Sequence, residues 1–194
     1  MPRGTRKTRW QLVAVETGRS LVGVDSWVAN RLVEALLRES PPFGLPAGRW
    51  RREVRYRDVR FDFGRVGPDS RGPTALVEVK SGNLAEGTTA LFPDAPTSRG
   101  AHHLERMAQA ARRGLRAMLI VVVLRSDVRT WQPNAAADPV FAERLREAQR
   151  AGVEIRAVST AVRPGAISWG TALPINRTVD RVERFSSRPN SRSP

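Results

Sequence analysis

"LVEVKSG", residues 76–82, combines the signal of a buried strand with a polar pair that a buried strand does not need. Because successive side chains of a strand point to opposite faces, Val77 and Val79 share one face while Glu78 and Lys80 share the other. Lys80 is one of only two lysines, whereas arginine supplies 31 of the 33 basic side chains. A lysine at this place indicates a chemical role, since arginine cannot lose its proton in a protein.

The strands expected around this stretch each carry one carboxylate. They lie at about 49–57, 59–66 and 74–81, separated by short turns. Alternation places Phe61 and Phe63 on one face and Asp62 on the other. It divides the first strand in the same way, into Trp50, Val54 and Tyr56 against Arg51, Glu53 and Arg55. If the three strands are neighbours, Glu53, Asp62 and Glu78 converge beside Lys80.

Two or three carboxylates beside a lysine suit a Mg²⁺ (or Mn²⁺) site with open positions for phosphate. Mg²⁺ prefers hard oxygen ligands and keeps several waters. On a scissile phosphate it acidifies the attacking water, which Lys80 can orient or deprotonate. The alternative is structural: Glu78 and Lys80 form a solvent-facing pair and Asp62 is a polar residue near a turn. The spacing D-x15-E-x-K alone does not exclude this, because it also arises by chance.

Helices and further strands complete an α/β pattern. A helix over "DSWVANRLVEALLRES" is capped by Asp25 or Ser26, and a second helix at about 98–113 is opened by Thr97 or Ser98. A buried strand at 116–124, a helix at 138–150 with Asp138 as its cap, and a final strand "GVEIRAVS" follow. We expect the apolar stripes of the first two helices to consist of Val28, Leu32, Ala35 and Leu36, and of Leu104, Met107, Ala108 and Ala111. This order predicts a mixed sheet flanked by helices.

Composition limits the class of protein. The 194 residues, 40% of them apolar, suit one domain at 10–177, with a basic flexible arm at 1–9 and an Arg/Ser/Pro-rich disordered tail at 178–194. No run is long enough for a membrane span, and a chain without cysteine fits the cytoplasm. A net charge of +14 and a pI near 11.7 favour nucleic acid, DNA or RNA, as the partner.

Five stretches, in order and spacing, closely resemble the sugar fermentation stimulation protein family (SfsA). They are "EVRYRDVRFDF", "VEVKSGNL", "FPDAPTSRGAHHLERM", "GLRAMLIVVVLR" and "AGVEIRAV", and "VDSWVANRLV" and "ALPIN" look like that family too. The resemblance runs from about residue 5 to 177. It implies a restriction-endonuclease-like (PD-(D/E)XK) α/β core with DNA binding and nuclease activity, in which Asp62, Glu78 and Lys80 form the catalytic triad. Glu53 matches a family acid on the preceding strand.

The same resemblance carries further positions and some departures. Asp94, Thr97, Arg99 and His103 match positions of the "FPDA…T.RG..H" motif. The resemblance starts at the family's nuclease half, without the N-terminal OB-like domain. We therefore expect either a separate OB-type partner or a homodimer. Val59, Ser98 and His102 replace the usual serine, glutamate and lysine, which bears on substrate preference more than on chemistry.

Several residues have both a functional and a structural interpretation. Thr97 and Asp94 either hold a phosphate at a helix N-terminus, together with Arg99, or simply cap the helix. His103 is a phosphate or water contact or a plain histidine, and Asn30 approaches the site or lies on an exposed helix face. Arg51 and Arg55 are expected to meet phosphates without reading sequence. Among the tryptophans we expect Trp27, Trp50 and Trp131 to pack in the core, and Trp10 and Trp169 to be candidates for base stacking.

The sequence therefore predicts a Mg²⁺-dependent nuclease acting on DNA and/or RNA, with Asp62, Glu78 and Glu53 as metal ligands and Lys80 at the attacking water. The alternative is a non-catalytic DNA-binding or regulatory protein of sugar metabolism genes. Convergent carboxylates argue against a pure binder, because they repel phosphate unless a metal is present.

Overall fold

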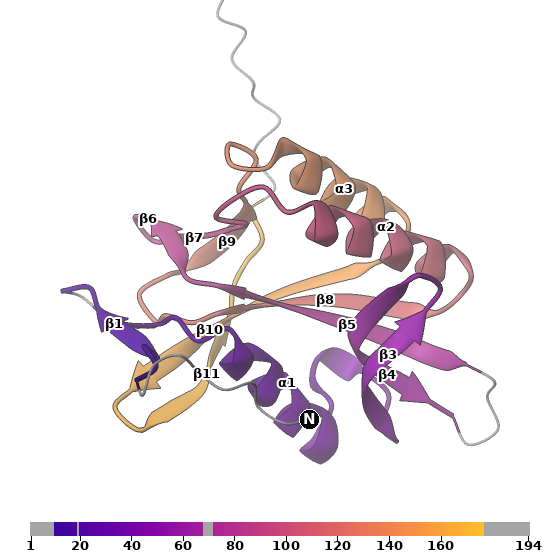
Figure 1. The fold of residues 1–194 in the computed structure, drawn as a ribbon, viewed down its shortest axis with the longest axis horizontal. Coiled ribbons are helices and arrows are strands. Elements are labelled where there is room, and N and C mark those ends of the chain that lie inside the picture. Colours follow the sequence, from indigo (N-terminus) through magenta and orange to yellow (C-terminus); the bar gives the residue numbers. More distant parts are fainter. Residues whose placement is uncertain (1–9, 19, 68–71, 177–194) are drawn as a thin grey trace, which may run out of the picture.

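The computed structural model describes residues 10–18, 20–67 and 72–176, so the arm at 1–9 and the tail at 178–194 lie outside the described residues. Its centre is a six-stranded mixed sheet with the strand order β11-β10-β8-β5-β4-β3 (Figure 1). The strands β5, β8 and β10 are parallel, and β3, β4 and β11 add antiparallel edges. The bounds in chain order are β3 Trp50–Tyr56, β4 Val59–Val66, β5 Pro73–Gly82, β8 Arg116–Val123, β10 Glu154–Arg163 and β11 Ala166–Ala172.

Three helices cover the two faces of this sheet. Helix α1 (Trp27–Glu39) packs on one face, and α2 (Ser98–Arg112) and α3 (Pro139–Arg150) pack together on the other (Figure 1). Strand β8 is buried between the two layers, with Leu119 and Val121 facing α2 and Met118 and Ile120 facing α1. The expected α/β architecture, a mixed sheet flanked by helices, is confirmed.

Most of the expected helix contacts are confirmed, with one shift. Helix α2 buries Leu104, Met107 and Ala108 as expected. Helix α1 instead buries Ala29, Val33 and Leu37, one position after the expected stripe, while Ala35 is exposed. Seven of the ten residues from 28 to 37 are apolar, so periodicity did not fix which side of the helix meets the sheet.

The strand β5 alternates as expected, but the hairpin β3–β4 does not. Phe61 packs in the α2-side core and Phe63 in the α1-side core, so the two phenylalanines do not share a face. In β3, Trp50 packs toward α1 whereas Val54 packs toward α2. In β3 the break coincides with Glu53, whose φ of 53° lies in the left-handed region and interrupts the alternation of side chains.

Short elements complete the fold. A β1–β2 hairpin (Ala14–Glu16 and Leu21–Gly23) precedes α1, and the 3-10 turn η1 (Pro42–Gly44) follows it. Strands β6 (Leu84–Glu86), β7 (Thr89–Phe92) and β9 (Thr130–Pro133) form a second sheet (Figure 1). The final strand expected from the sequence, "GVEIRAVS", corresponds to β10, and the structure adds the edge strand β11 after it. None of the described helices is long and apolar enough to cross a membrane.

Candidate active site

The site begins where β4 separates from β5. The β4–β5 ladder includes the pair Phe63↔Val77, and no pairing follows it toward Asp62. There the Asp62 side chain replaces the ladder: its Oδ2 accepts the Val79 N–H at 2.8 Å, and its Oδ1 accepts the Asn30 amide of α1 at 3.0 Å. The irregular hairpin and the separating strand thus hold one carboxylate, half-buried, over the centre of β5.

Glu78 is the second carboxylate, and it is almost completely buried, with its side chain 3% exposed. Its Oε1 accepts two hydrogen bonds, from Lys80 Nζ at 2.6 Å and from His103 Nδ1 at 2.7 Å. Its Oε2 is also buried but has no partner. Lys80 remains accessible, with 19% of its side chain exposed. Asp62, Glu78 and Lys80 are therefore brought together as the sequence predicts.

The pKa values of the two carboxyl groups move apart. Burial and the negative charge of Glu78 raise the pKa of Asp62 to about 6, against the opposing effects of the Val79 N–H and Lys80. Burial alone would raise the pKa of Glu78 as well, but the hydrogen bond from His103 and the charge of Lys80 outweigh burial and lower it. Of the two carboxyl groups, Glu78 therefore stays ionised more readily, and Asp62 takes up a proton more readily.

Glu53 is not brought to this pair. Its side chain is 59% exposed, and its nearest charged partner is Arg60, at 3.8 Å. The left-handed φ of Glu53 explains why a residue directly opposite Asp62 in the β3–β4 register does not point with it. Glu53 instead lines a shallow groove of about 440 Å³ on the edge strand, together with Arg51 and Arg55. These arginines are exposed, as phosphate contacts must be.

The motif residues at the start of α2 mainly build the helix. Thr97 Oγ1 accepts the Gly100 N–H at 3.0 Å, so Thr97 is the N-cap. The Thr97 N–H in turn donates to Asp138, which also caps α3 through the Phe141 N–H. The capping interpretation of Thr97 therefore holds. Asp94 and Arg99 are exposed.

His103 does not lie where a phosphate could reach it. Its side chain is 5% exposed, its Nδ1 contacts Glu78, and its ring meets Phe61 edge-on with a centroid distance of 5.5 Å. The expected phosphate contact is corrected to a buried contact with a carboxylate. The adjacent His102 points elsewhere, to Asp58 in the β3–β4 turn, where Arg106 also binds.

Two residues of the site have contacts that the sequence left open. Of the two interpretations of Asn30, the one in which it approaches the site is confirmed, because its amide donates a hydrogen bond to Asp62. For His103 neither interpretation, a phosphate or water contact or a plain histidine, specifies its contact with Glu78. The only sequence signal for either was its place inside a family motif, since a single polar residue on a helix reveals its partner only after the helix is docked.

The residues present fit a divalent cation of the Mg²⁺ type. Among the described residues, no group of three or more His, Cys, Asp or Glu side chains is arranged to hold a metal. Asp62 and Glu78 nevertheless supply two carboxylates, and the unpaired Oε2 of Glu78 is costly to bury unless a donor or cation meets it. Mg²⁺ is usually held by one or two carboxylates, with water and substrate phosphate completing its shell.

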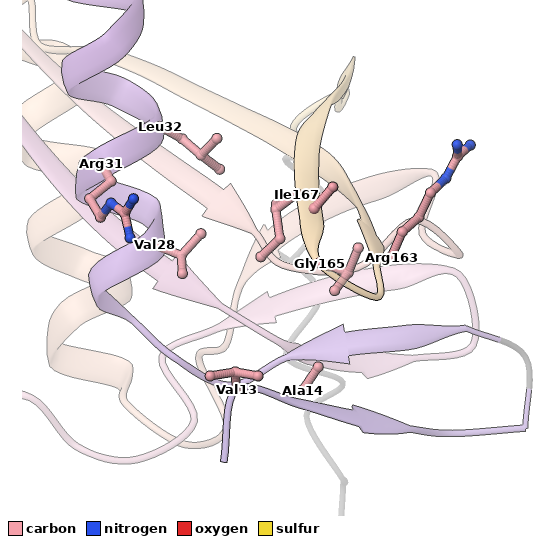
Figure 2. A pocket seen from close by; sticks show the side chains of 10 residues that line it. Val13, Ala14, Val28, Arg31, Leu32, Arg163, Gly165 and Ile167 are labelled. Atoms are coloured by element: carbon pink, nitrogen blue, oxygen red, sulfur yellow. The ribbon is translucent and has the colours of Figure 1, made fainter. Parts of the chain in front are cut away.

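A separate groove of about 410 Å³ lies away from these residues, between α1 and the β10–β11 hairpin. Val28 and Leu32 of α1 point toward Ile167 of the hairpin, and Arg163 points away (Figure 2). None of Asp62, Glu78 and Lys80 lines it. Nearby Trp27 is 68% exposed, so the expectation that it packs in the core is wrong, whereas Trp131 is fully buried.

The chain is similar to proteins of one family. The family model described as "Sugar fermentation stimulation protein RE domain" matches residues 27–166. A sugar fermentation stimulation protein homolog of Chloroflexus aurantiacus is 42% identical over 173 residues, 88% of this chain and 65% of that protein. A homolog from Symbiobacterium thermophilum is 43% identical over 183 residues, 90% of this chain and 71% of that protein. The chain thus spans about two thirds of the length of these relatives.

A solved structure has the same fold. It is described as the structure of Pyrococcus furiosus SfsA in complex with Ca²⁺, and it matches with a TM-score of 0.77 and 30% sequence identity. The match covers 91% of this chain and 76% of that one. Together with the mixed sheet and its three flanking helices, it bears out the restriction-endonuclease-like core.

Proposed function

This chain belongs to the sugar fermentation stimulation protein family, and from that premise we propose that it is a metal-dependent nuclease that hydrolyses phosphodiester bonds of DNA and/or RNA. The observation that carries the proposal is the pair Asp62 and Glu78 at the separation of β4 from β5, with a buried Glu78 oxygen that has no partner. A Ca²⁺ complex of the Pyrococcus furiosus protein supports a divalent cation in this fold.

Asp62 and Glu78 would hold Mg²⁺ or Mn²⁺. When bound, the cation supplies neutralisation of phosphate charge and acidification of the attacking water. In hydrolysis, the water oxygen forms a bond to phosphorus while the bond from phosphorus to the leaving sugar oxygen breaks. The water gives up a proton as it attacks and the leaving sugar oxygen takes one up, so the step balances with solvent carrying the proton between them.

Lys80 can orient the attacking water through its free N–H groups. One of its three N–H groups is used on Glu78 Oε1, and the other two can orient the attacking water or contact a phosphate oxygen. Asn30 and the Val79 N–H hold Asp62 in place, so the carboxylate needs no rearrangement before it meets a ligand. A nucleic-acid substrate also agrees with the net charge of +14. The proposal places this activity in the cytoplasm.

The test is cleavage of labelled single- and double-stranded DNA and RNA with Mg²⁺ or Mn²⁺, by the wild type and by Lys80→Ala. We expect metal-dependent cutting that falls at least about 100-fold in the variant, the usual size of a general acid–base contribution. Arg144→Ala on the outer surface of α3 is the control, because it also removes one positive charge.

Three outcomes are informative. Loss of cutting in Lys80→Ala with normal cutting in Arg144→Ala supports the proposal and identifies the substrate. Equal cutting by all three proteins removes Lys80 from the chemistry. Binding by the wild type without cutting, unchanged by chelator, overturns the nuclease and leaves a DNA-binding or regulatory protein.

A further inference from the structure

We infer that His103 is a positioning residue: its hydrogen bond to Glu78 Oε1 turns the carboxylate so that Oε2 is the oxygen presented to the metal. This inference rests on the proposed function, since it assigns a role within the same metal site. Nothing in the family resemblance gives His103 this task.

Both donors to Glu78 act on the same oxygen. Lys80 Nζ and His103 Nδ1 lie 2.6 and 2.7 Å from Oε1, and Oε2 receives no hydrogen bond. A buried carboxylate ordinarily distributes its donors over both oxygens, because each unpaired oxygen carries a desolvation cost of about 1–3 kcal/mol or more. Two donors on one oxygen and none on the other therefore mark Oε2 as the atom kept for a further ligand.

The two donors differ in how firmly they are held. Lys80 is partly exposed and reaches Glu78 through a long flexible side chain. His103 is buried, and its ring is fixed edge-on against Phe61. Its helix is fixed as well, because the N-cap Thr97 is itself held by Asp138. The rigid donor sets the orientation of the carboxylate, while Lys80 can leave Oε1 for the substrate.

The hydrogen bond also specifies which ring nitrogen carries a proton. An ionised carboxylate only accepts, so His103 Nδ1 must donate. A side chain with an N–H at the same distance from the backbone should therefore replace histidine in part. Asparagine has its amide nitrogen at that position, whereas leucine has a similar branching shape and no donor.

The experiment is titration calorimetry of the full chain with MnCl₂, without nucleic acid, so that the readout is metal binding and not cleavage. We compare the wild type, His103→Leu and His103→Asn. We expect His103→Leu to raise the Kd for Mn²⁺ by about 10- to 100-fold, the usual effect of losing a group that orients a metal ligand. His103→Asn should recover most of that loss.

Controls separate positioning from general damage to α2. Met107→Leu changes another buried side chain of the same helix without a hydrogen bond to Glu78, and it should leave the Kd unchanged. Thermal unfolding identifies variants that do not fold. If His103→Leu is unfolded, the milder His103→Asn and His103→Gln pair decides: Asn should bind Mn²⁺ more tightly than Gln, whose amide lies one carbon further out.

The outcomes distinguish a failure of the positioning role of His103 from a failure of the proposed metal site. A wild type that does not bind Mn²⁺ overturns the metal site and with it the proposed function. A wild type that binds, with a folded His103→Leu that binds equally well, overturns only the positioning role. Equal binding by the Asn and Gln variants likewise overturns it, because donor placement would then not matter.

Discussion

At the scale of single residues, the pKa values of Asp62 and Glu78 shift in opposite directions because the surroundings of the two carboxyl groups differ. Glu78 has two cationic or donating neighbours on one oxygen, and its pKa is lowered. Burial and the nearby negative charge of Glu78 raise the pKa of Asp62 to about 6. Two carboxyl groups whose pKa values are pushed apart are a common property of catalytic sites. A cation near both would remove the repulsion that raises the pKa of Asp62.

The raised pKa of Asp62 predicts a pH dependence with a definite sign. Its pKa in the folded protein, about 6, exceeds the ordinary value of 3.8, so protonated Asp62 stabilises the metal-free fold. That contribution is full below about pH 4 and is lost as the pH rises through 6. Mn²⁺ competes with this proton, so its affinity should weaken about tenfold per pH unit below 6.

Thermal unfolding with and without MnCl₂ at pH 5 and 7.5 measures this effect. We expect the rise in Tm caused by Mn²⁺ to be clearly larger at pH 7.5. In Asp62→Asn the rise should be small at both pH values, because a neutral amide neither titrates nor attracts the cation as strongly. An equal rise at both pH values in the wild type would contradict the assignment of Asp62 as the titrating ligand.

At the scale of elements, the hairpin β3–β4 holds the position of Asp62 through an irregularity at the opposite residue. Glu53 has a left-handed φ, and the faces of both strands change at this point. Gly64 belongs to the same adjustment, because a Cβ there would lie 2.8 Å from Val54. The hairpin is also fixed to α2 through Asp58 and Arg106. Local backbone geometry, rather than strand alternation, thus brings Asp62 over β5.

Glu53→Gly separates the backbone role of this residue from a role as metal ligand. Glycine relieves the left-handed conformation, so we expect the free energy of unfolding in urea to rise by about 0.5–1 kcal/mol. Glu53→Ala removes the same carboxylate but keeps the strain, and it should not stabilise. The exposed pair with Arg60 contributes little in either variant. Both variants should bind Mn²⁺ like the wild type, and a loss of tenfold or more in both would restore Glu53 as a ligand.

The elements that sequence reasoning found are those with long, regular signals. Strand β8 is a continuous apolar run, and α3 carries both its cap Asp138 and Pro139 at its first position. The missed strands β6, β7 and β9 are three or four residues long, too short to show a period. Their pairing, such as that of Thr89 with Thr130, joins distant segments and depends on the folded chain.

The same distinction applies to the site. Glu78 and Lys80 could be found because they alternate with valines on the regular strand β5. Asp62 was indicated mainly by the family resemblance, because β4 does not alternate as its sequence suggests. The contacts of Asn30 and His103 could not be found, because they depend on how α1 and α2 dock on opposite faces of the sheet. The prediction that Glu53 joins Asp62 and Glu78 is wrong. One residue with a left-handed φ changes the face of the side chains in β3, and no glycine in the sequence marks that position.

At the scale of the whole molecule, the proposed function requires the net charge of +14 to be distributed so that it attracts nucleic acid to the site. Many arginines are committed to ion pairs: on α3, Arg144 pairs with Glu147 and Arg146 pairs with Glu143. In contrast, Arg51 and Arg55 are exposed along the groove of the edge strand β3, without a carboxylate partner among the described residues. This edge adjoins the strand of Asp62, and we propose it as the surface that contacts phosphates.

Salt dependence tests this distribution of charge. Each neutralised phosphate contributes about 0.9 to the slope of log K against log salt for duplex DNA and about 0.7 for single strands. The double variant Arg51→Gln/Arg55→Gln should therefore flatten the slope by about 1.4–1.8. Arg144→Gln/Arg146→Gln removes the same charge from α3 and should leave the slope unchanged. Fluorescence anisotropy with labelled DNA in chelator, which prevents metal-dependent cutting, gives the slopes. Equal slopes for the two double variants would mean that net charge, and not the β3 edge, attracts the nucleic acid.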